Sequence, residues 1–178
     1  RDALDRIVER KVNGVTIARY GFGDSSDSPT STRTGSGTII EAVLGLPGGV
    51  ALTTRTGGNV WSYPNTHGDM AAIANNAGVK QGSSTTYDPF GNTIAGTTHD
   101  NSAGSFDYGW LGSFQRPAEA EASLQQVVEM GNRQYVPILG RFLERDQIED
   151  GTATNSYGYV ADPINSTDLS GTCFLWCR

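Results

Sequence analysis

A cluster of acidic residues near the C-terminal end is the feature of this sequence that most suggests chemistry. The stretch GRFLERDQIEDGT, residues 140–152, holds four acids and two arginines but only three apolar side chains. Acids among turn-forming residues ordinarily bond their own backbone or face water. Two carboxyl groups held close together can instead serve as acid and base on a nearby peptide bond, because their pKa values are pushed apart. The residues alone leave both interpretations open.

Other catalytic arrangements have weaker support. His67 and Asp69 could pair as a base and its orienting acid, but residues so close in sequence rarely supply that geometry, and no G-x-S-x-G motif supplies a nucleophile. We therefore expect His67 to be a turn residue. No glycine-rich stretch leads through Lys into a helix, which excludes a phosphate loop.

The two cysteines, Cys173 and Cys177, lie at the end of the chain. They can close a small disulfide loop in an oxidising compartment or remain thiols. His67 and His99 are too far from them in sequence to suggest a shared metal site. We expect no metal and no cofactor.

Composition favours an all-β protein. The chain has 178 residues, 23 of them glycine, and only 18% are charged, which suits many short strands joined by tight turns. The net charge of -6 argues against a nucleic-acid partner. No apolar run approaches the roughly 18 residues that span a bilayer, so we expect no membrane insertion. The first residue is not Met, so we expect a fragment or a processed product.

Turn signals divide the chain into serial hairpins. Asn13-Gly14, Gly57-Gly58 and the stretch from Asn75 to Gly78 each separate two runs of strand-forming residues. Residues 23–37 have almost nothing to bury and predict a mobile loop. We expect a loop or helical turn over 117–122 and a strand over 123–130, where apolar residues alternate.

Two phrases resemble a known family. TYDPFGN at 86–92 is similar to the tyrosine-aspartate (YD) repeat of the RHS family, with Tyr87, Asp88 and Gly91 as its motif residues, and the opening DALDRIVER is similar to a truncated repeat. MGNRQYVPILGRFLERDQIEDG and YGYVADPINSTDLSG, within residues 130–171, resemble the RHS repeat-associated core domain. The resemblance covers nearly the whole chain.

This resemblance implies a strip of antiparallel hairpins that forms part of a β-shell and ends in an RHS core domain. The expected divisions are YD-repeat hairpins over 1–115, the core domain over 116–172 and a short tail over 173–178. The implied partners are the N-terminal RHS shell of the same parent chain, a C-terminal toxin and its immunity protein. The implied setting is a bacterial protein that is secreted or associated with the cell surface or wall.

The family's core domain resembles an aspartic protease that cuts its own chain to separate a C-terminal toxin. The matched acids here are Asp146 and Asp168, with Arg145 beside the first acid to hold a carboxylate by a charge-assisted bond. The implied scissile bond joins Thr172 to Cys173. The chain departs from the family pattern at four positions, where proline, glycine and leucine are replaced: Gln147, Leu169, Glu149 and Thr172.

Three functions follow as expectations. The first is a structural role, in which the chain is the C-terminal core of an RHS shell that encloses or caps a toxin cargo. The second is an active self-cleaving aspartic protease, which would make autoproteolysis the only enzymatic activity. The third is a surface adhesin that binds carbohydrate or protein through aromatic side chains, although strand aromatics more often pack between hairpins. The candidate aromatics are Trp61, Trp110, Tyr87 and Tyr108.

Overall fold

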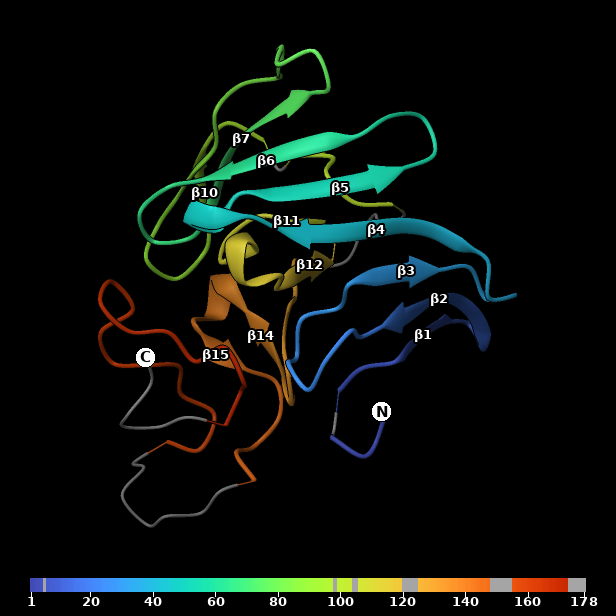
Figure 1. Ribbon diagram of the computed structural model, residues 1–178. Coiled ribbons are helices and arrows are strands. Elements are labelled where there is room, and N and C mark those ends of the chain that lie inside the picture. Colours follow the sequence, from blue (N-terminus) through green and yellow to red (C-terminus); the bar gives the residue numbers. More distant parts are fainter. Residues whose placement is uncertain (5, 98, 104–105, 120–124, 148–154, 173–178) are drawn as a thin grey trace.

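Antiparallel strands make up most of the structure. The computed structural model describes residues 1–178 except 5, 98, 104–105, 120–124, 148–154 and 173–178. In this described part the strands form three sheets, of eight, two and five strands (Figure 1). The all-β class that the composition predicts is confirmed.

Strand order follows chain order in both larger sheets. The eight-stranded sheet contains β1 (Glu9–Val12), β2 (Val15–Gly21), β3 (Ser31–Arg33), β4 (Ile39–Gly45), β5 (Ala51–Arg55), β6 (Val60–Pro64), β7 (Met70–Asn75) and β8 (Lys80–Gln81). A small hairpin pairs β9 (Thr86–Tyr87) with β10 (Thr93–Ala95). The five-stranded sheet contains β11 (Phe106–Tyr108), β12 (Pro117–Glu119), β13 (Val128–Met130), β14 (Arg133–Val136) and β15 (Arg141–Phe142). Three short 3-10 helices connect strands: η1 (Pro47–Gly49), η2 (Gly112–Phe114) and η3 (Pro137–Leu139).

The hairpin turns lie where the sequence predicts them. Asn13 and Gly14 join β1 to β2 with φ of 49° and 81°, the left-handed pair that an Asn-Gly turn needs. Gly57 and Gly58 lie between β5 and β6. Asn75 begins the turn from β7 to β8, where it accepts the N–H of Gly78 and bonds Val79.

The structure corrects two expectations of irregular backbone. Residues 31–33, inside the stretch expected to be a loop, form β3 between β2 and β4. Residues 117–119, expected to be a loop or helical turn, form β12. In both places backbone pairing with neighbouring strands decides the conformation, since ladder hydrogen bonds do not depend on apolar side chains or on helix propensity. The strand expected over 123–130 is present at 128–130.

An aromatic core lies beneath the five-stranded sheet. Trp110 stacks on Tyr135 with ring centroids 5.2 Å apart, and Tyr159 packs 4.6 Å from Tyr135 and 5.8 Å from Phe142. The core also includes Leu111, Ala118, Val128, Met130 and Val160. Burial of this many large rings is a major source of stability for the C-terminal half.

The aromatic set proposed for an adhesin is not an exposed face. Trp110 and Tyr108 are buried, with exposed fractions of 0% and 4%, and Tyr87 packs against the core. Trp61 is half-buried on the large sheet, where its indole donates to Asn76. These rings pack between elements, as strand aromatics usually do. Among the described residues, no helix has the length and apolar character needed to cross a membrane.

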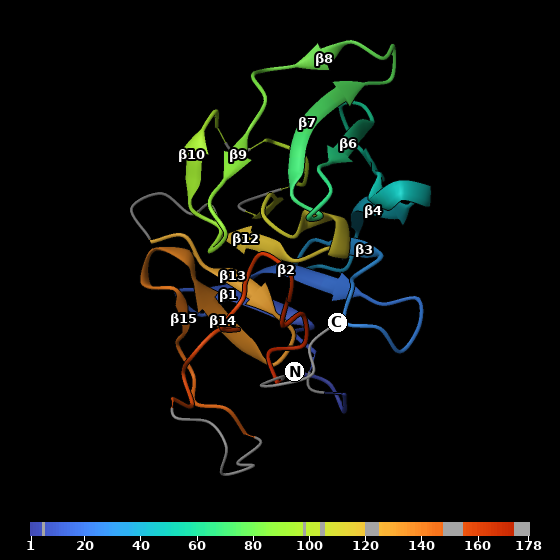
Figure 2. The ribbon, with the colours of Figure 1, turned by 90° about the vertical axis from the view of Figure 1, so that its left-hand side faces the viewer.

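The two larger sheets lie at an angle to each other. Figure 1 shows the large sheet rising from β1 to β7, with the five-stranded sheet in orange and yellow below β4 and beside β1 and β2. Figure 2, turned by 90°, shows the red C-terminal segment running across β13 and β14. The candidate acids belong to this lower region.

Candidate functional site

One buried arginine holds both candidate acids. Nη2 of Arg133 lies 2.9 Å from Oδ2 of Asp146 and 3.1 Å from Oδ2 of Asp168. Exposed fractions are 2% for Arg133, 8% for Asp146 and 1% for Asp168. The fold therefore brings together two carboxylates that are far apart in sequence, on one nitrogen.

The first strand of the site is β14, which begins at Arg133. A two-residue turn, Gly131-Asn132, joins β13 to β14, and Gly131 adopts a φ of 59°. The side chain of Arg133 donates through Nη1 to the carbonyl of Ser156 at 3.1 Å, and its Cζ lies 3.7 Å from the ring centre of Phe142. The carbonyl of Ser156 and the ring of Phe142 thus hold the guanidinium in the position from which it binds the two acids.

Asp146 reaches the site from the chain that follows β15. Its backbone N–H donates to the carbonyl of Ser156 at 2.9 Å. Because Arg133 bonds the same carbonyl, Ser156 fixes the acid and the arginine relative to each other. Burial of an ion pair is unfavourable unless hydrogen bonds complete it, and these contacts provide that completion.

Asp168 caps a tight turn and also takes part in the ion pair. Its Oδ1 accepts the backbone N–H of Thr172 at 3.2 Å and the hydroxyl of Ser170 at 3.4 Å, while Oδ2 faces Arg133. Gly171 has a φ of 66°, which completes the turn. Asp168 is therefore a turn cap that also shares the guanidinium of Arg133 with Asp146, and its catalytic role stays a prediction.

The same turn recurs through the chain. Asp88 accepts the N–H of Asn92 at 2.9 Å, and Gly91 of that turn has a φ of 91°. Asn65 and Asn75 cap corresponding turns with a glycine three residues later. An Asp or Asn oxygen replaces a backbone acceptor in each case, and glycine tolerates the positive φ. Asp88 and Gly91 thus belong to one copy of a repeated turn, with Gly91 against the indole of Trp110, while the tyrosine position of the expected motif holds Pro64 and Ala74 in the other two copies.

The turn of Asp168 is docked on the turn before Arg133. The N–H of Asn132 donates to the carbonyl of Ser170 at 2.9 Å, and Nε of Arg133 donates to the carbonyl of Gly171. A Cβ on Gly171 would lie 2.3 Å from the carbonyl oxygen of Met130, a distance that real side chains do not reach. Glycine is therefore required here for close approach as well as for its φ.

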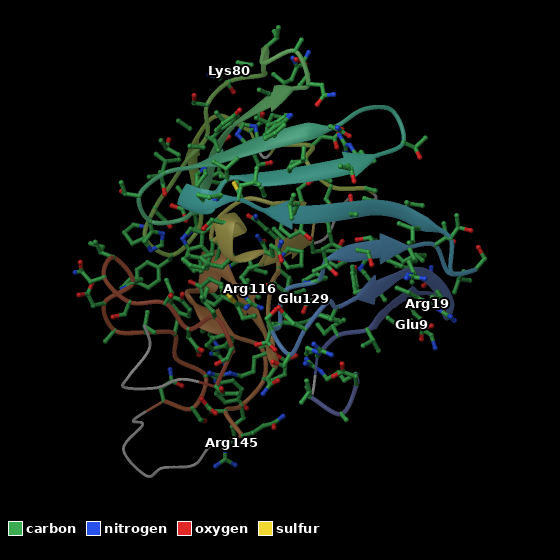
Figure 3. The ribbon with its side chains drawn as sticks, viewed as in Figure 1. Glu9, Arg19, Lys80, Arg116, Glu129 and Arg145 are labelled. Carbon is green, nitrogen blue, oxygen red and sulfur yellow. The ribbon has the colours of Figure 1, made fainter. Side chains whose placement is uncertain are left out.

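The remaining predicted residues occupy different positions. Arg145 is exposed, and its side chain points outward at the lower edge of the molecule in Figure 3, whereas the guanidinium on the two acids is that of Arg133. Thr172 is half-buried beside Asp168. Cys173, Cys177 and Glu149 lie outside the described residues, so the scissile bond and the disulfide stay predictions. Leu169, which replaces a proline of the family pattern, packs against the aromatic core.

Sequence reasoning missed Arg133. The residue lies within the phrase MGNRQYVP that carries the family resemblance, and that position was the available signal. Nothing in its local spacing indicates a contact with acids that follow much later, because the contact depends on the register of β13, β14 and the docked turn.

His67 and Asp69 do form the pair that their sequence proximity argued against. Nδ1 of His67 lies 2.9 Å from Oδ1 of Asp69, and Nε2 lies 3.0 Å from the carbonyl oxygen of Pro163. Asp69 also accepts the N–H of Leu111 at 3.1 Å. Both ring nitrogens have hydrogen-bond partners, so His67 joins the β6–β7 turn to the C-terminal segment.

No family model matches the chain, and no curated protein matches it. Several solved structures do match the chain. A crystal structure of TcdB2-TccC3-TEV aligns over 95% of this chain with 18% identity and a TM-score of 0.60. A Photorhabdus luminescens Tc holotoxin pore with a mutated TccC3 aligns over 96% with 19% identity and a TM-score of 0.59, and TcdB2-TccC3 without its hypervariable C-terminal region over 92% with 18% and 0.55. This chain spans about 8% of the length of each of those chains. At this identity the likeness establishes the fold alone: over most of its length this chain shares the fold of part of these structures.

Proposed function

We propose that this chain is the C-terminal core region of an RHS-type shell protein and that its main role is structural. The observation that carries the proposal is the alignment of the sequential antiparallel sheet, over 95% of the chain, with a Tc toxin component. A meander of this kind can be extended at its edge strand by further hairpins of the same type, each of which contacts only its neighbours. Residues 1–115 would be wall hairpins, 116–172 the core domain and 173–178 a tail.

The cargo in this proposal is a C-terminal toxin enclosed by the shell, with an immunity protein as a further partner. One structural relative is described as lacking a hypervariable C-terminal region, which is consistent with variable cargo after a core domain in that protein. The parent protein would be bacterial and secreted or associated with the cell wall. The adhesin alternative requires an exposed set of aromatic side chains, and two members of that set, Trp110 and Tyr108, are buried.

Electron cryomicroscopy of the natural full-length parent protein tests the structural role. We expect a closed, hollow β-shell whose wall includes residues 1–115 of this chain, with Asp168 and Arg133 in the core domain that caps the shell. A parent protein in which this region hangs as a separate globular module outside any shell would contradict the proposal.

Self-cleavage is a second candidate, favoured by the contact between Asp168 and the backbone of Thr172. In this reaction a water molecule loses a proton to one carboxylate and adds to the carbonyl carbon of Thr172. The bond from that carbon to the nitrogen of Cys173 then breaks, and the other carboxyl group donates its proton to the departing amine. Asp146 and Asp168 are the acids for these steps, and one of them has to carry a proton at the start.

Arg133 holds the two acids in place in this second candidate function. Its guanidinium touches both acids, so it sets their separation and offsets one of their two negative charges. We treat Arg133 as a positioning residue, because it contacts the acids and not the peptide bond.

Intact-mass spectrometry of the purified chain tests self-cleavage separately from the shell. A cleaving protein ends at Thr172 and releases the six-residue peptide CFLWCR, and both products disappear in Asp168→Asn and Asp146→Asn. Incubation at acid pH should increase the cleaved fraction, because the reaction needs one carboxyl group in its acid form. A full-length mass at every pH, identical in wild type and Asp168→Asn, rejects self-cleavage and leaves the structural role intact.

A further inference from the structure

A cavity of about 470 Å³ lies between the two larger sheets. The large sheet contributes Arg10 from β1 and Tyr20 from β2, the five-stranded sheet contributes Phe106 and Glu129, and Arg116 lies just before β12. Its volume falls within the range of about 300–1,000 Å³ that is usual for small-molecule sites. The cavity is separate from the pair of acids on Arg133.

Alternation along the strands explains the polar lining. Ala118 pairs with Val128 across β12 and β13, and both side chains belong to the aromatic core. Their neighbours Glu119 and Glu129 therefore face the opposite side of the sheet, toward β1 and β2. Glu119 forms an ion pair with Nη2 of Arg10 across the gap. Because side chains alternate between the two faces of a strand, Glu119 and Glu129 point into the cavity.

Several of these groups lack hydrogen-bond partners. In the described residues, eight buried side-chain polar atoms have none, and four of the eight belong to residues that line this cavity. They are Nη1 of Arg10, the hydroxyl of Tyr20, Nε of Arg116 and Oε2 of Glu129. Buried polar atoms are nearly always satisfied in folded proteins, so the side chains around this cavity are unusual in holding so many unsatisfied atoms.

Arg116 is the most unusual of the four. Its exposed fraction is 6%, yet it forms no ion pair within the described part of the chain. Burial lowers the pKa of its guanidinium, and the negative charges of Asp27, which lines the same cavity, and Asp168 offset this in part. Buried arginines are ordinarily paired, because an isolated buried charge is costly. An anion beside Arg116 would remove that cost.

The other groups restrict the occupant further. Nη1 of Arg10 and the hydroxyl of Tyr20 add donors, and Oε1 of Glu129 already accepts the side chain of Gln134 at 2.8 Å. Burial raises the pKa of Glu129, and the side chain of Gln134 offsets this in part. Phe106 and Phe22 give the cavity an aromatic wall. Figure 3 shows Arg116 and Glu129 near the centre of the molecule, on the side of the five-stranded sheet that meets the first strands.

We propose that this cavity binds a small organic anion, with a carboxylate or phosphate head held by Arg116 and Arg10 and an apolar body against Phe106 and Phe22. The hydroxyl of Tyr20 donates to the same head group. The site is independent of the proposed shell role and of self-cleavage, since none of its residues is one of the two acids or Arg133. Binding joins β1 and β2 to the five-stranded sheet, so it stabilises the contact between the sheets.

Isothermal titration calorimetry at neutral pH with three probes tests the proposal. Benzoate and phenyl phosphate carry the two head groups, and benzamide is an uncharged control of nearly the same shape as benzoate. We expect at least one anion to bind and benzamide to bind at least tenfold more weakly. The tighter of the two anions identifies the head group. Equal affinity for benzoate and benzamide, or no anion binding up to about 10 mM, overturns the proposal.

Variants assign the binding to Arg116. Arg116→Met should weaken the anion at least tenfold while leaving the unliganded protein as resistant to urea as wild type or more so, because an unpaired buried cation is gone. Arg19→Met, which changes an exposed arginine on β2, should bind as wild type does. In wild type, the ¹⁵Nε resonance of Arg116 should shift on titration and that of Arg55 should not. Unchanged binding by Arg116→Met, or an Arg116 ¹⁵Nε resonance that does not shift on titration, contradicts the assignment.

Discussion

The backbone N–H of Thr172 donates to the carboxylate of Asp168 at 3.2 Å, so the acid at the start of this turn holds the residue at its end. The opposite oxygen of the same carboxylate faces Arg133. A change that opens the turn therefore also moves the acid away from the arginine. This coupling between turn geometry and ion pairing leads to the first prediction.

Gly171→Ala should destabilise the protein and displace Asp168. A Cβ at this position meets the carbonyl of Met130 at 2.3 Å and would also adopt a positive φ. We expect a loss of about 2–4 kcal/mol in the free energy of unfolding, from strain and from a weakened buried ion pair. Urea denaturation measures it.

Gly14→Ala is the matched control for this change. Gly14 has a φ of 81° with nothing within 4 Å of the added Cβ, so the substitution isolates backbone strain, at about 1 kcal/mol. Equal losses in the two variants would show that close packing at Gly171 contributes nothing.

Arg133→Met should destabilise the protein strongly, because two buried carboxylates would lose their shared cation. Removal of one partner from a buried ion pair typically costs about 3–5 kcal/mol. The triple variant Arg133→Met, Asp146→Asn, Asp168→Asn should regain most of that loss, since no uncompensated charge remains. Denaturant melts at neutral pH measure both.

Arg19→Met serves as the control, because Arg19 is exposed and its pairing with Glu9 is solvated. A surface pair of this kind contributes little, so the expected change is within about 0.5 kcal/mol. Similar losses for the two arginine variants would contradict the central place given to Arg133.

Asp107 should make the protein less stable as pH rises from about 4 to about 7. Burial raises the pKa of Asp107 to about 6 from 3.8, and the backbone N–H groups of Asn101 and Ser102 offset this only in part. The folded state therefore binds the proton more tightly than the unfolded state, and the associated stability is lost as pH rises through the folded pKa. Asp107 is half-buried, so we expect a contribution of about 1–2 kcal/mol after allowance for solvent.

Asp107→Asn removes this slope, while its side-chain oxygen can still accept the two N–H groups. Urea denaturation at pH 4, 5, 6 and 7 compares the variant with wild type. Asp24→Asn provides a control of opposite sign, because the hydroxyl and N–H of Ser26 lower the pKa of that exposed carboxyl. A wild-type slope that survives in Asp107→Asn would assign the effect to another group.

Trp110→Ala should cost about 3–5 kcal/mol, since the indole is fully buried between Tyr135, Tyr159 and His67. Trp61→Ala, on the half-buried face of the large sheet, should cost about 1–2 kcal/mol. Thermal melts followed by near-ultraviolet circular dichroism measure both. Comparable losses would mean that the aromatic core does not dominate the stability of the chain.

The sequence predicted the turns better than the long-range contacts. Asn13-Gly14 and the Asx turn at Asp88 follow from local chemistry, because the side chain bonds a backbone group only a few residues away. β3 was missed because its polar residues are held by neighbouring strands, with buried Thr32 bonding Glu41 at 2.7 Å. Arg133 was missed for the related reason that its partners are set by the register of several strands.

The family resemblance identified Asp146 and Asp168, but it did not predict that both side chains are buried. Spacing places Asp146 and Asp168 in turns, but burial depends on which segments cover them, and that is a property of the assembled fold. The pairing of His67 with Asp69 was similarly unexpected, since the β6–β7 turn bends the two side chains together. Local chemistry thus identified the residues, and tertiary packing determined their contacts.

The matching order of strands in space and in sequence has a consequence for biosynthesis. Each strand of the larger sheets pairs with the one translated just before it, so every new ladder closes only a short loop of chain, at a small entropic cost. The sheet can therefore grow vectorially at the ribosome, one hairpin at a time. The exposed edge of an incomplete sheet is then covered within seconds by the next strand, at ordinary rates of synthesis.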